Sequence, residues 1–203
     1  MTNELLSWLA SHWIEMVGAL LGIIYVVLSV KQNILTWLLG LLTSLFYIYV
    51  FFDTGFYADM SLQFYYVWVS IYGWVLWYKG KSTDHGKEEL PVSHIPKRLL
   101  LVLTLLAIVL WGGIWFVLKK FTDSPVPVGD SFITALSIVA TWMLARKIIE
   151  HWLVWIVADS VSFLLYLYKG MYPTVLLYVV YTIAAVWGYV EWKKDLAKKS
   201  ADE

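Results

Sequence analysis

One face of a long apolar segment carries a carboxylate and two tryptophans. In HWLVWIVADSVSFLLYLYKG, Trp152, Trp155 and Asp159 stand at i, i+3 and i+7, so a helix would place all three on the same side. If the helix crosses a membrane, the carboxylate should face the bundle interior or a water-filled cavity, because a bilayer-facing Asp costs about 3 kcal/mol. Since indole faces attract cations, this pattern predicts a site for a flat ligand that carries positive charge.

A second polar stripe has the same spacing and is expected to belong to the same site. It consists of Gln63, Tyr66 and Ser70, again at i, i+3 and i+7. The wall is predicted to be completed by residues of two further helices: Thr43, Tyr47, Tyr178, Tyr181 and Thr182. The alternative interpretation is structural, because such polar groups also hydrogen-bond neighbouring helices, and Asp159 could do the same.

The composition of the whole chain is that of a membrane protein. Of its 203 residues, 61% are hydrophobic and only 15% are charged, and the mean hydropathy is +0.70, far above what a soluble core of this size could bury. The N-terminal stretch MTNELLSWLASHW has no basic region and no cleavage pattern, so we expect the first helix to act as its own insertion signal. The absence of cysteine leaves the redox compartment undetermined.

Seven apolar segments are candidates for membrane-spanning helices, which need roughly 20 residues; the first and the fifth are short, and we expect flanking residues to extend them. They are Met16–Val30, Leu35–Phe52, Met60–Tyr78, Leu99–Leu118, Ser131–Ala145, Trp152–Tyr168 and Thr174–Glu191. The stretch KGKSTDHGKEELPVSHIPKR reads as a solvated loop. The predicted organisation is a first three-helix unit (1–78), a cytoplasmic loop (79–98), a linker helix (99–121), a second three-helix unit (122–192) and a cytoplasmic tail (193–203).

The lysines and arginines predict the orientation of these helices. With the N-terminus outside, 12 of the 15 basic residues fall on the cytoplasmic side, and only Lys119, Lys120 and Lys169 fall outside. Cytoplasmic loops are enriched in Lys and Arg. We therefore expect a multi-pass protein of the bacterial inner membrane with its N-terminus outside and its C-terminus in the cytoplasm.

The two three-helix units are related in sequence. An ungapped shift of 115 residues gives 10 identities in 43 positions, among them Trp37 with Trp152, Gly73 with Gly188 and Trp77 with Trp192. Two units of three helices run parallel only if one further helix reverses the chain between them. The predicted fold is thus all-α, with two parallel three-helix repeats and a linker helix (3+1+3), the layout of SWEET-type transporters, whose substrate lies between the repeats.

Aromatic and glycine residues at the helix ends have simpler interpretations. Trp13, Trp77, Trp187 and Trp192 are predicted to form interfacial belts, as aromatic residues near helix ends usually do. Gly73 and Gly188 are predicted to be positions of close helix packing.

Three segments together resemble the PnuC-type vitamin transporters. They are QFYYVWVSIYGWVLW (63–77), WLVWIVADSVS (152–162) and YKGMYPTVLLYVVYTIAAVWGYVEW (168–192), and the resemblance extends from about Glu15 to Trp192. It implies a 3+1+3 helix fold, a homotrimer, and facilitated diffusion of a vitamin that a cytoplasmic kinase phosphorylates and traps. It also implies that Trp152, Trp155, Asp159 and Gln63 contact the substrate.

The residue at position 159 departs from the pattern of the nicotinamide riboside carriers. Those proteins typically have Asn at the end of WxxWxxxN, whereas this sequence has Asp159. Both thiamine and nicotinamide riboside are flat cations, but thiamine has an aminopyrimidine that a carboxylate binds through charge-assisted hydrogen bonds. The sequence therefore slightly favours thiamine.

Two other functions stay open at this point. Asp159 could be the proton site of a symporter, or the chain could be a ligand sensor or scaffold whose loop 79–98 binds a cytoplasmic partner. The sequence contains no enzyme motif that would favour another function. The histidines His12, His85, His94 and His151 form no HExxH zinc motif, and no nucleotide-binding GxxxxGK[ST] motif occurs. We expect no metal, cofactor or nucleic-acid partner.

Overall fold

Seven helices make up most of the described part of the chain. The computed structural model describes the backbone of residues 2–54, 57–83 and 86–202, and the side chains of residues 16–53, 60–80 and 89–198. The helices in this part of the chain are α1 (Thr2–Val30), α2 (Leu35–Thr54), α3 (Tyr57–Lys79), α4 (Lys97–Phe121), α5 (Pro127–Ala145), α6 (His151–Tyr168) and α7 (Tyr172–Asp202).

Five of these helices are long and apolar enough to cross a membrane. Their candidate spans are Leu35–Asp53, Lys97–Phe121, Pro127–Ala145, His151–Tyr168 and Tyr172–Lys198. In α1 the apolar part within the described side chains is the shorter Met16–Val30, and α3 contains polar residues such as Gln63 and Ser70. Large apolar side chains cover the outside of the bundle, for example Leu101 and Val109 of α4, which is the surface expected of a protein surrounded by lipid.

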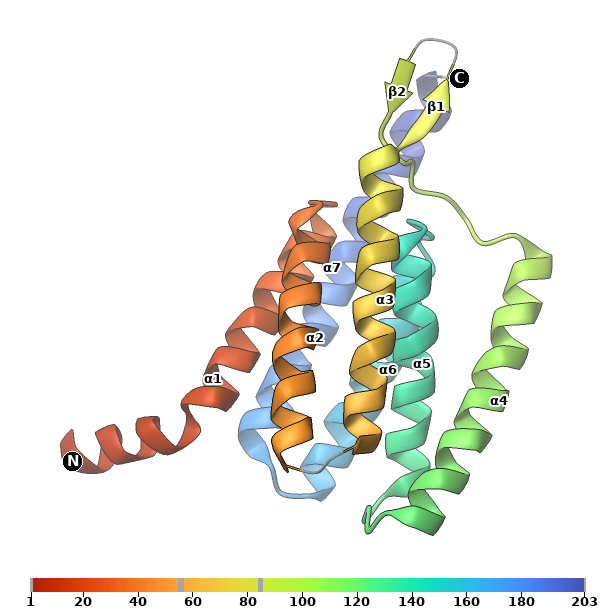
Figure 1. Cartoon of the computed structure of the whole chain (residues 1–203). Helices are drawn as coiled ribbons and strands as arrows, with labels where there is room; N and C mark the ends of the chain where they lie inside the picture. The colour runs from red at the N-terminus through yellow and green to blue at the C-terminus, as the bar shows by residue number, and fades with distance from the viewer. Residues whose placement is uncertain (1, 55–56, 84–85, 203) are drawn as a thin grey trace.

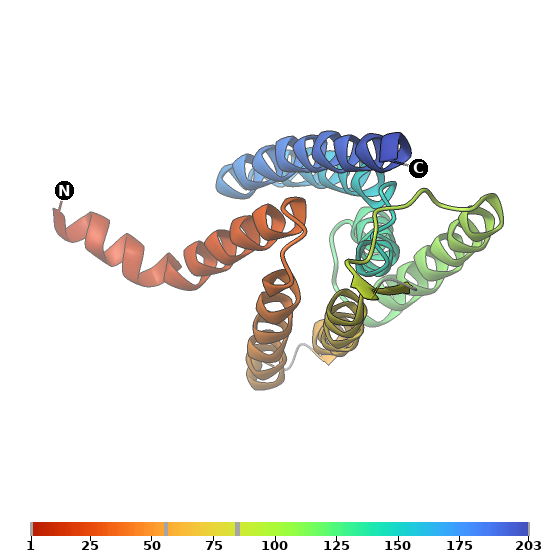
Figure 2. The same cartoon turned by 90° about the horizontal axis from the view of Figure 1, so that it is seen from above.

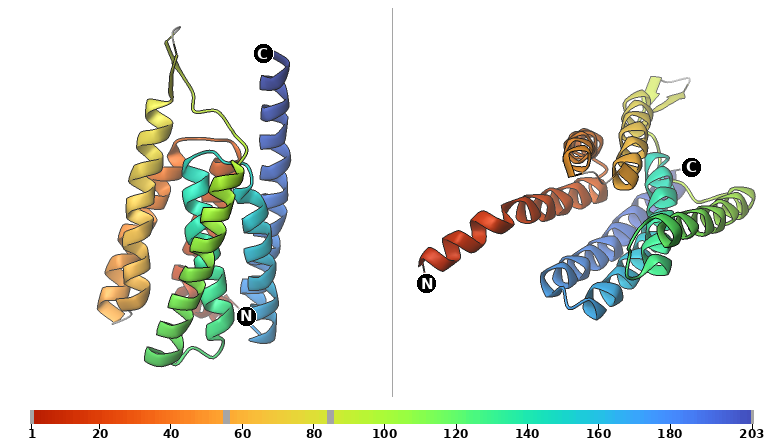
Figure 3. Two further views of the ribbon diagram at one scale, coloured as in Figure 1. Left: turned by 90° about the vertical axis from the view of Figure 1, so that its right-hand side faces the viewer. Right: turned by 60° about the horizontal axis from the view of Figure 1, so that its bottom comes forward.

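The helices run side by side, and α4 lies at one edge of the bundle. Figure 1 shows α2, α3, α5, α6 and α7 roughly antiparallel or parallel to one another, with the first part of α1 leaning away. Seen from above in Figure 2, α7 and α6 form one side, and α1 contacts α7. Helix α4 packs on α5, which it covers in the left view of Figure 3.

The 115-residue offset recurs in the contacts between helices. Trp37 packs on Gly73, and Trp152 packs on Gly188. The Trp37 and Trp77 rings meet edge-on with centroids 5.4 Å apart, and those of Trp152 and Trp192 meet edge-on at 5.7 Å. A side chain on either glycine would collide with the indole, so the prediction that Gly73 and Gly188 are close-packing positions is confirmed.

The turns α1–α2 and α5–α6 are built alike. Gln32 and Lys147, which are 115 positions apart, both adopt the left-handed conformation, with φ of 52° and 51°. The preceding hydrogen bonds also correspond, since Gln32 N donates to Ser29 O at 3.0 Å and Lys147 N donates to Leu144 O at 2.9 Å. Residues other than glycine seldom adopt positive φ, so two such turns at equivalent positions support the repeat interpretation.

Two tryptophans join one half of the bundle to the other. Trp77 Nε1 donates to Ala145 O, and Trp192 Nε1 donates to Val30 O, both at 3.1 Å. These two rings are buried, so the expectation that they lie in interfacial belts is wrong: their indole N–H groups satisfy carbonyls at the ends of α5 and α1. Trp187 is 40% exposed, in keeping with the belt, and the Trp13 side chain lies outside the described ones.

The segment between α3 and α4 has more structure than a solvated loop. Strands β1 (Lys81–Thr83) and β2 (Gly86–Glu88) pair antiparallel. Further along, Ser93 N donates to Lys147 O and Ile149 N donates to Ser93 O, both at 3.0 Å. The Glu150 carboxylate contacts His94 Nδ1 at 2.7 Å. Backbone groups of this segment hydrogen-bond to the turn between α5 and α6, and a hydropathy pattern cannot predict such contacts.

Candidate functional site

Asp159 lies in a small cavity between α1, α6 and α7. The cavity has a volume of about 170 Å³ and is lined by Gly22, Tyr25, Val26, Ser29, Leu144, His151, Trp152, Trp155, Asp159, Tyr181 and Ala185. Four residues predicted for the site thus meet here: Trp152, Trp155, Asp159 and Tyr181. The first three come from one face of α6, as the i, i+3, i+7 spacing requires.

The Asp159 carboxylate is buried without a compensating partner. It is 6% exposed, and within the described part of the chain no side chain hydrogen-bonds or ion-pairs with it. A buried charge is costly unless it is paired. A cation entering the cavity would supply the missing partner, beside the indole of Trp155.

Tyr181 and its repeat equivalent Tyr66 both reach across to the other half of the bundle. The Tyr181 hydroxyl lies against Gly22 of α1, where any side chain would collide with it. At the equivalent place, Tyr66 is hydrogen-bonded to the Ser137 side chain of α5. Glycine on one side and serine on the other therefore give the two halves different polarity, and only the side of Tyr181 opens into the cavity.

The α3 residues of the predicted site do not line the cavity. The Ser70 hydroxyl and the Tyr25 ring both approach Gly40, to within 3.0 Å and 3.2 Å of where a Cβ would stand. Ser70 is buried and lines neither cavity described here. Gln63 is half-buried on the same helix and lines neither cavity described here.

The remaining predicted residues do not line the cavity. Tyr178 stacks on Tyr166 with ring centroids 5.3 Å apart and meets Tyr181 edge-on at 5.9 Å. The Thr182 hydroxyl donates to Tyr178 O at 2.8 Å. The Tyr47 hydroxyl approaches α1 at Gly18, and Thr43 is half-buried on α2.

Sequence reasoning missed the contribution of α1 and of the first residue of α6. Gly22, Tyr25 and Ser29 share a face of α1 by their i, i+3, i+7 spacing, which is the one signal that could have identified them. The sequence assigned His151 no role beyond its absence from any HExxH pair, yet it is fully buried and lines the cavity.

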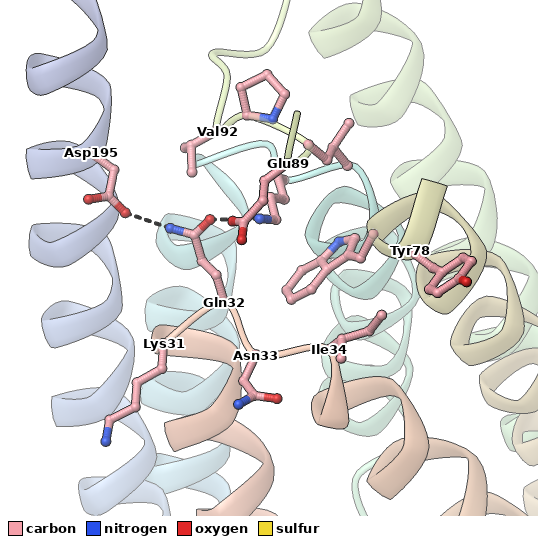
Figure 4. Close-up of a pocket in the computed structure, with 12 residues that line it drawn as sticks. Lys31, Gln32, Asn33, Ile34, Tyr78, Glu89, Val92 and Asp195 are labelled. Carbon is pink, nitrogen blue, oxygen red and sulfur yellow. Dashed lines mark hydrogen bonds between the residues drawn. The ribbon is translucent and has the colours of Figure 1, made fainter. Parts of the chain in front are cut away.

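A larger cavity opens at the loop end of the bundle. It has a volume of about 790 Å³ and is lined by Lys31, Gln32, Asn33, Ile34, Trp77, Tyr78, Glu89, Leu90, Pro91, Val92, Lys147 and Asp195. Figure 4 shows Gln32 between Asp195 and Glu89 in this cavity. Its walls come largely from loops and hold charges of both signs, and the Trp77 ring in its wall already has the Lys147 ammonium over it.

Hydrogen bonds centred on Gln32 close this end of the bundle. The Lys147 ammonium donates to Gln32 Oε1 at 2.8 Å, and Gln32 Nε2 donates to Asp195 Oδ2 at 2.6 Å. Lys147 is 3% exposed and lies 4.7 Å above the Trp77 ring. Burial lowers the pKa of Lys147, while the Glu89 and Asp195 carboxylates act in the opposite direction. We call Gln32, Lys147 and Asp195 the inner clasp.

Comparison with known proteins assigns the chain to a family of carriers. The profile of the nicotinamide mononucleotide transporter family matches residues 12–194. The chain belongs to this family. Its members transport small vitamins across membranes, and the chain is accordingly a multi-pass membrane transporter of the PnuC type.

Several relatives resemble the chain over most of its length. The nicotinamide riboside transporter PnuC of Escherichia coli is 26% identical, covering 89% of this chain and 84% of its own. PnuC of Neisseria mucosa is 29% identical, with 96% and 75% covered. The riboflavin/roseoflavin transporter RibM of Streptomyces davaonensis is 28% identical, with 89% and 84% covered.

A solved structure has the same fold. The crystal structure of the vitamin B3 transporter PnuC superposes with a TM-score of 0.73 at 26% identity, covering 97% of this chain and 87% of that one. The family assignment based on the resemblance is confirmed. The slight preference for thiamine finds no support among these relatives, which are named for nicotinamide riboside or riboflavin.

Proposed function

We propose that this protein carries nicotinamide riboside across the bacterial inner membrane by facilitated diffusion. The observation that carries the proposal is the buried, unpartnered Asp159 carboxylate in a cavity that it shares with Trp155. A pyridinium cation stacked on the indole would offset that charge. The names of the relatives that we compared support the riboside.

The carrier works with two parallel three-helix repeats joined by α4, with its N-terminus outside. The contacts that recur at the 115-residue offset support this arrangement. Lys31, Lys79, Arg146 and Lys147 gather at the end that we assign to the cytoplasm. Substrate enters from outside, and rocking of the repeats then opens the inner clasp.

The cavity must widen when substrate binds. Its volume of about 170 Å³ is below the roughly 300–1,000 Å³ of typical ligand pockets. Tyr178, whose ring meets that of Tyr181 edge-on, would join the wall once side chains move, and rocking of the repeats would bring in Gln63 of α3. Phosphorylation by a cytoplasmic kinase would then trap the product, and the protein would assemble as a homotrimer.

Thiamine is the second candidate because of the carboxylate itself. A charged acceptor at position 159 suits an aminopyrimidine better than the Asn of typical riboside carriers would. Charge attracts both cations, so affinity must decide between them.

Calorimetry on the purified protein tests the proposal. Nicotinamide riboside, thiamine and riboflavin are titrated in parallel, and proteoliposomes then show whether the ligand equilibrates without a gradient. Tight binding of the riboside alone supports the proposal. Binding of thiamine alone would identify the protein as a thiamine carrier. Binding without transport would indicate a ligand sensor.

A further inference from the structure

A buried ring nitrogen in the cavity lacks a hydrogen-bond partner. His151 is 0% exposed, and its Nδ1 lies 2.7 Å from Ile148 O. A carbonyl oxygen can only accept, so the proton of the ring is on Nδ1. Nε2 has no partner in the described part of the chain.

The surroundings of His151 make Nε2 an acceptor in a fixed position. The ring lies between Trp152 and Trp192, with centroids 4.4 Å and 4.7 Å away, which prevents it from turning. An unpaired charge is costly in such an apolar place, so the ring is neutral. A neutral imidazole with its proton on Nδ1 presents a lone pair at Nε2.

We propose that His151 Nε2 accepts a hydrogen bond from a hydroxyl group of the transported molecule, away from its cationic ring, and thereby helps to select it. This inference rests on the proposed function. His151 and Asp159 are eight residues apart on α6, about 12 Å along the helix, and both line the cavity. The selected ligand is therefore elongated, with a cationic ring at Asp159 and Trp155 and a hydrogen-bond donor toward His151.

The repeat equivalent of His151 provides the structural comparison. Thr36, 115 positions earlier, is also buried, and its hydroxyl likewise lacks a partner. Thr36 lines neither cavity described here. An unpartnered atom at this turn is therefore tolerated by the fold, and what distinguishes His151 is its place in the cavity. Thr36→Val is accordingly the matched control.

The test compares two ligands with the same cationic ring. Nicotinamide riboside carries the ribose hydroxyls as donors, whereas 1-methylnicotinamide has the ring and the charge without the ribose. Calorimetry on the purified full-length protein is performed for the wild type, His151→Phe, His151→Gln and Thr36→Val, with the melting temperature as a check on folding.

We expect His151→Phe to weaken riboside binding about tenfold, as the loss of one neutral hydrogen bond does, and to leave 1-methylnicotinamide within twofold. His151→Gln, which retains an acceptor, restores riboside binding, and Thr36→Val changes neither ligand. Equal weakening of both ligands, or no weakening of the riboside, overturns the inference. If the wild type binds no vitamin of the panel above, the proposed function fails first and the inference falls with it.

Discussion

In the proposed site, the carboxylate of Asp159 and the ring of Trp155 would act together on a cation. In water either group would attract a cation only weakly. In the cavity neither side chain is hydrogen-bonded or ion-paired to another side chain in the described part of the chain. Electrostatic attraction strengthens as water is excluded. Substitutions at these positions should therefore change affinity rather than folding.

Asp159→Asn should weaken binding of the cationic vitamin by roughly 10- to 100-fold, because a hydrogen bond to a charged group is worth about 1.5–3 kcal/mol. Isothermal titration calorimetry measures the change. Asp53→Asn removes the same charge at the exposed end of α2 and serves as the control. Undiminished affinity in Asp159→Asn would exclude the carboxylate as the cation's partner.

Trp155→Leu should reduce affinity for the same ligand by about 1–2 kcal/mol through loss of the indole face. Trp187→Leu is the matched change on the exposed surface of α7 and should have no effect on binding. Quenching of tryptophan fluorescence by the vitamin should decrease in the first variant and persist in the second. Equal affinities in the two variants would contradict stacking on Trp155.

Helical spacing predicted part of the site and could not predict the rest. Trp152, Trp155 and Asp159 form a polar stripe that the 3.6-residue period resolves, and they do line one cavity. Tyr25 looks like any aromatic residue of an apolar helix, and its place in the cavity depends on how α1 packs against α7. Packing between distant helices is not encoded in local periodicity.

At the scale of the helices, the contacts that recur at the 115-residue offset were predictable because they rest on rare residues at a constant spacing. Each tryptophan ring occupies the space that a side chain on its glycine would fill, which holds for Trp37 at Gly73 and for Trp152 at Gly188. The burial of Trp77 and Trp192 was not predictable, since it depends on carbonyls at the ends of α5 and α1. Their position near helix ends alone indicated the membrane interface, whereas both rings are buried in the protein.

Gly188→Ala and Gly73→Ala should each lower the melting temperature in detergent, because the added methyl collides with an indole and overpacking costs about 1–3 kcal/mol. Gly113→Ala in α4 is the control: no atom lies within 4 Å of its Cβ position, and alanine is the better helix former. Thermal unfolding followed by light scattering gives the melting temperatures of the three variants, which can then be ranked. A Gly188→Ala protein as stable as Gly113→Ala would contradict the packing.

At the scale of the molecule, the inner clasp holds the two halves together at the loop end. Gln32 belongs to the first half, Lys147 and Asp195 to the second, and the bonds that join them must break for this end to open. We therefore expect the clasp to influence how much of the time the protein is open toward that side.

Lys147→Met should increase opening at this end by removing the bond to Gln32 while keeping an apolar contact with Trp77. Because the chain has no cysteine, Leu90→Cys in the larger cavity provides a single thiol. Its labelling by a maleimide should accelerate several-fold in Lys147→Met. Lys31→Met, an exposed position of the same cavity, should leave the rate unchanged, and acceleration in both would attribute the effect to charge alone.

Facilitated diffusion predicts that vitamin equilibrates across proteoliposomes at the same final level with or without a proton gradient. The reason is that an uncoupled carrier can only equalise the electrochemical potential of the cation, which means equal concentrations when the membrane potential is clamped at zero in both measurements. Radiolabel uptake with and without a protonophore measures this. Accumulation that the protonophore abolishes would instead make Asp159 a proton site.

The contact between Gln32 and Lys147 also bears on how such a protein could have evolved. These residues occupy equivalent positions in the two halves and touch each other, so they lie where a symmetric dimer of a single three-helix unit would bring a residue against its own copy. Two lysines there would repel each other, whereas a glutamine and a lysine bond. Such an unlike pair requires two copies of the gene segment that are fused and free to diverge, which a homodimer of identical subunits does not provide.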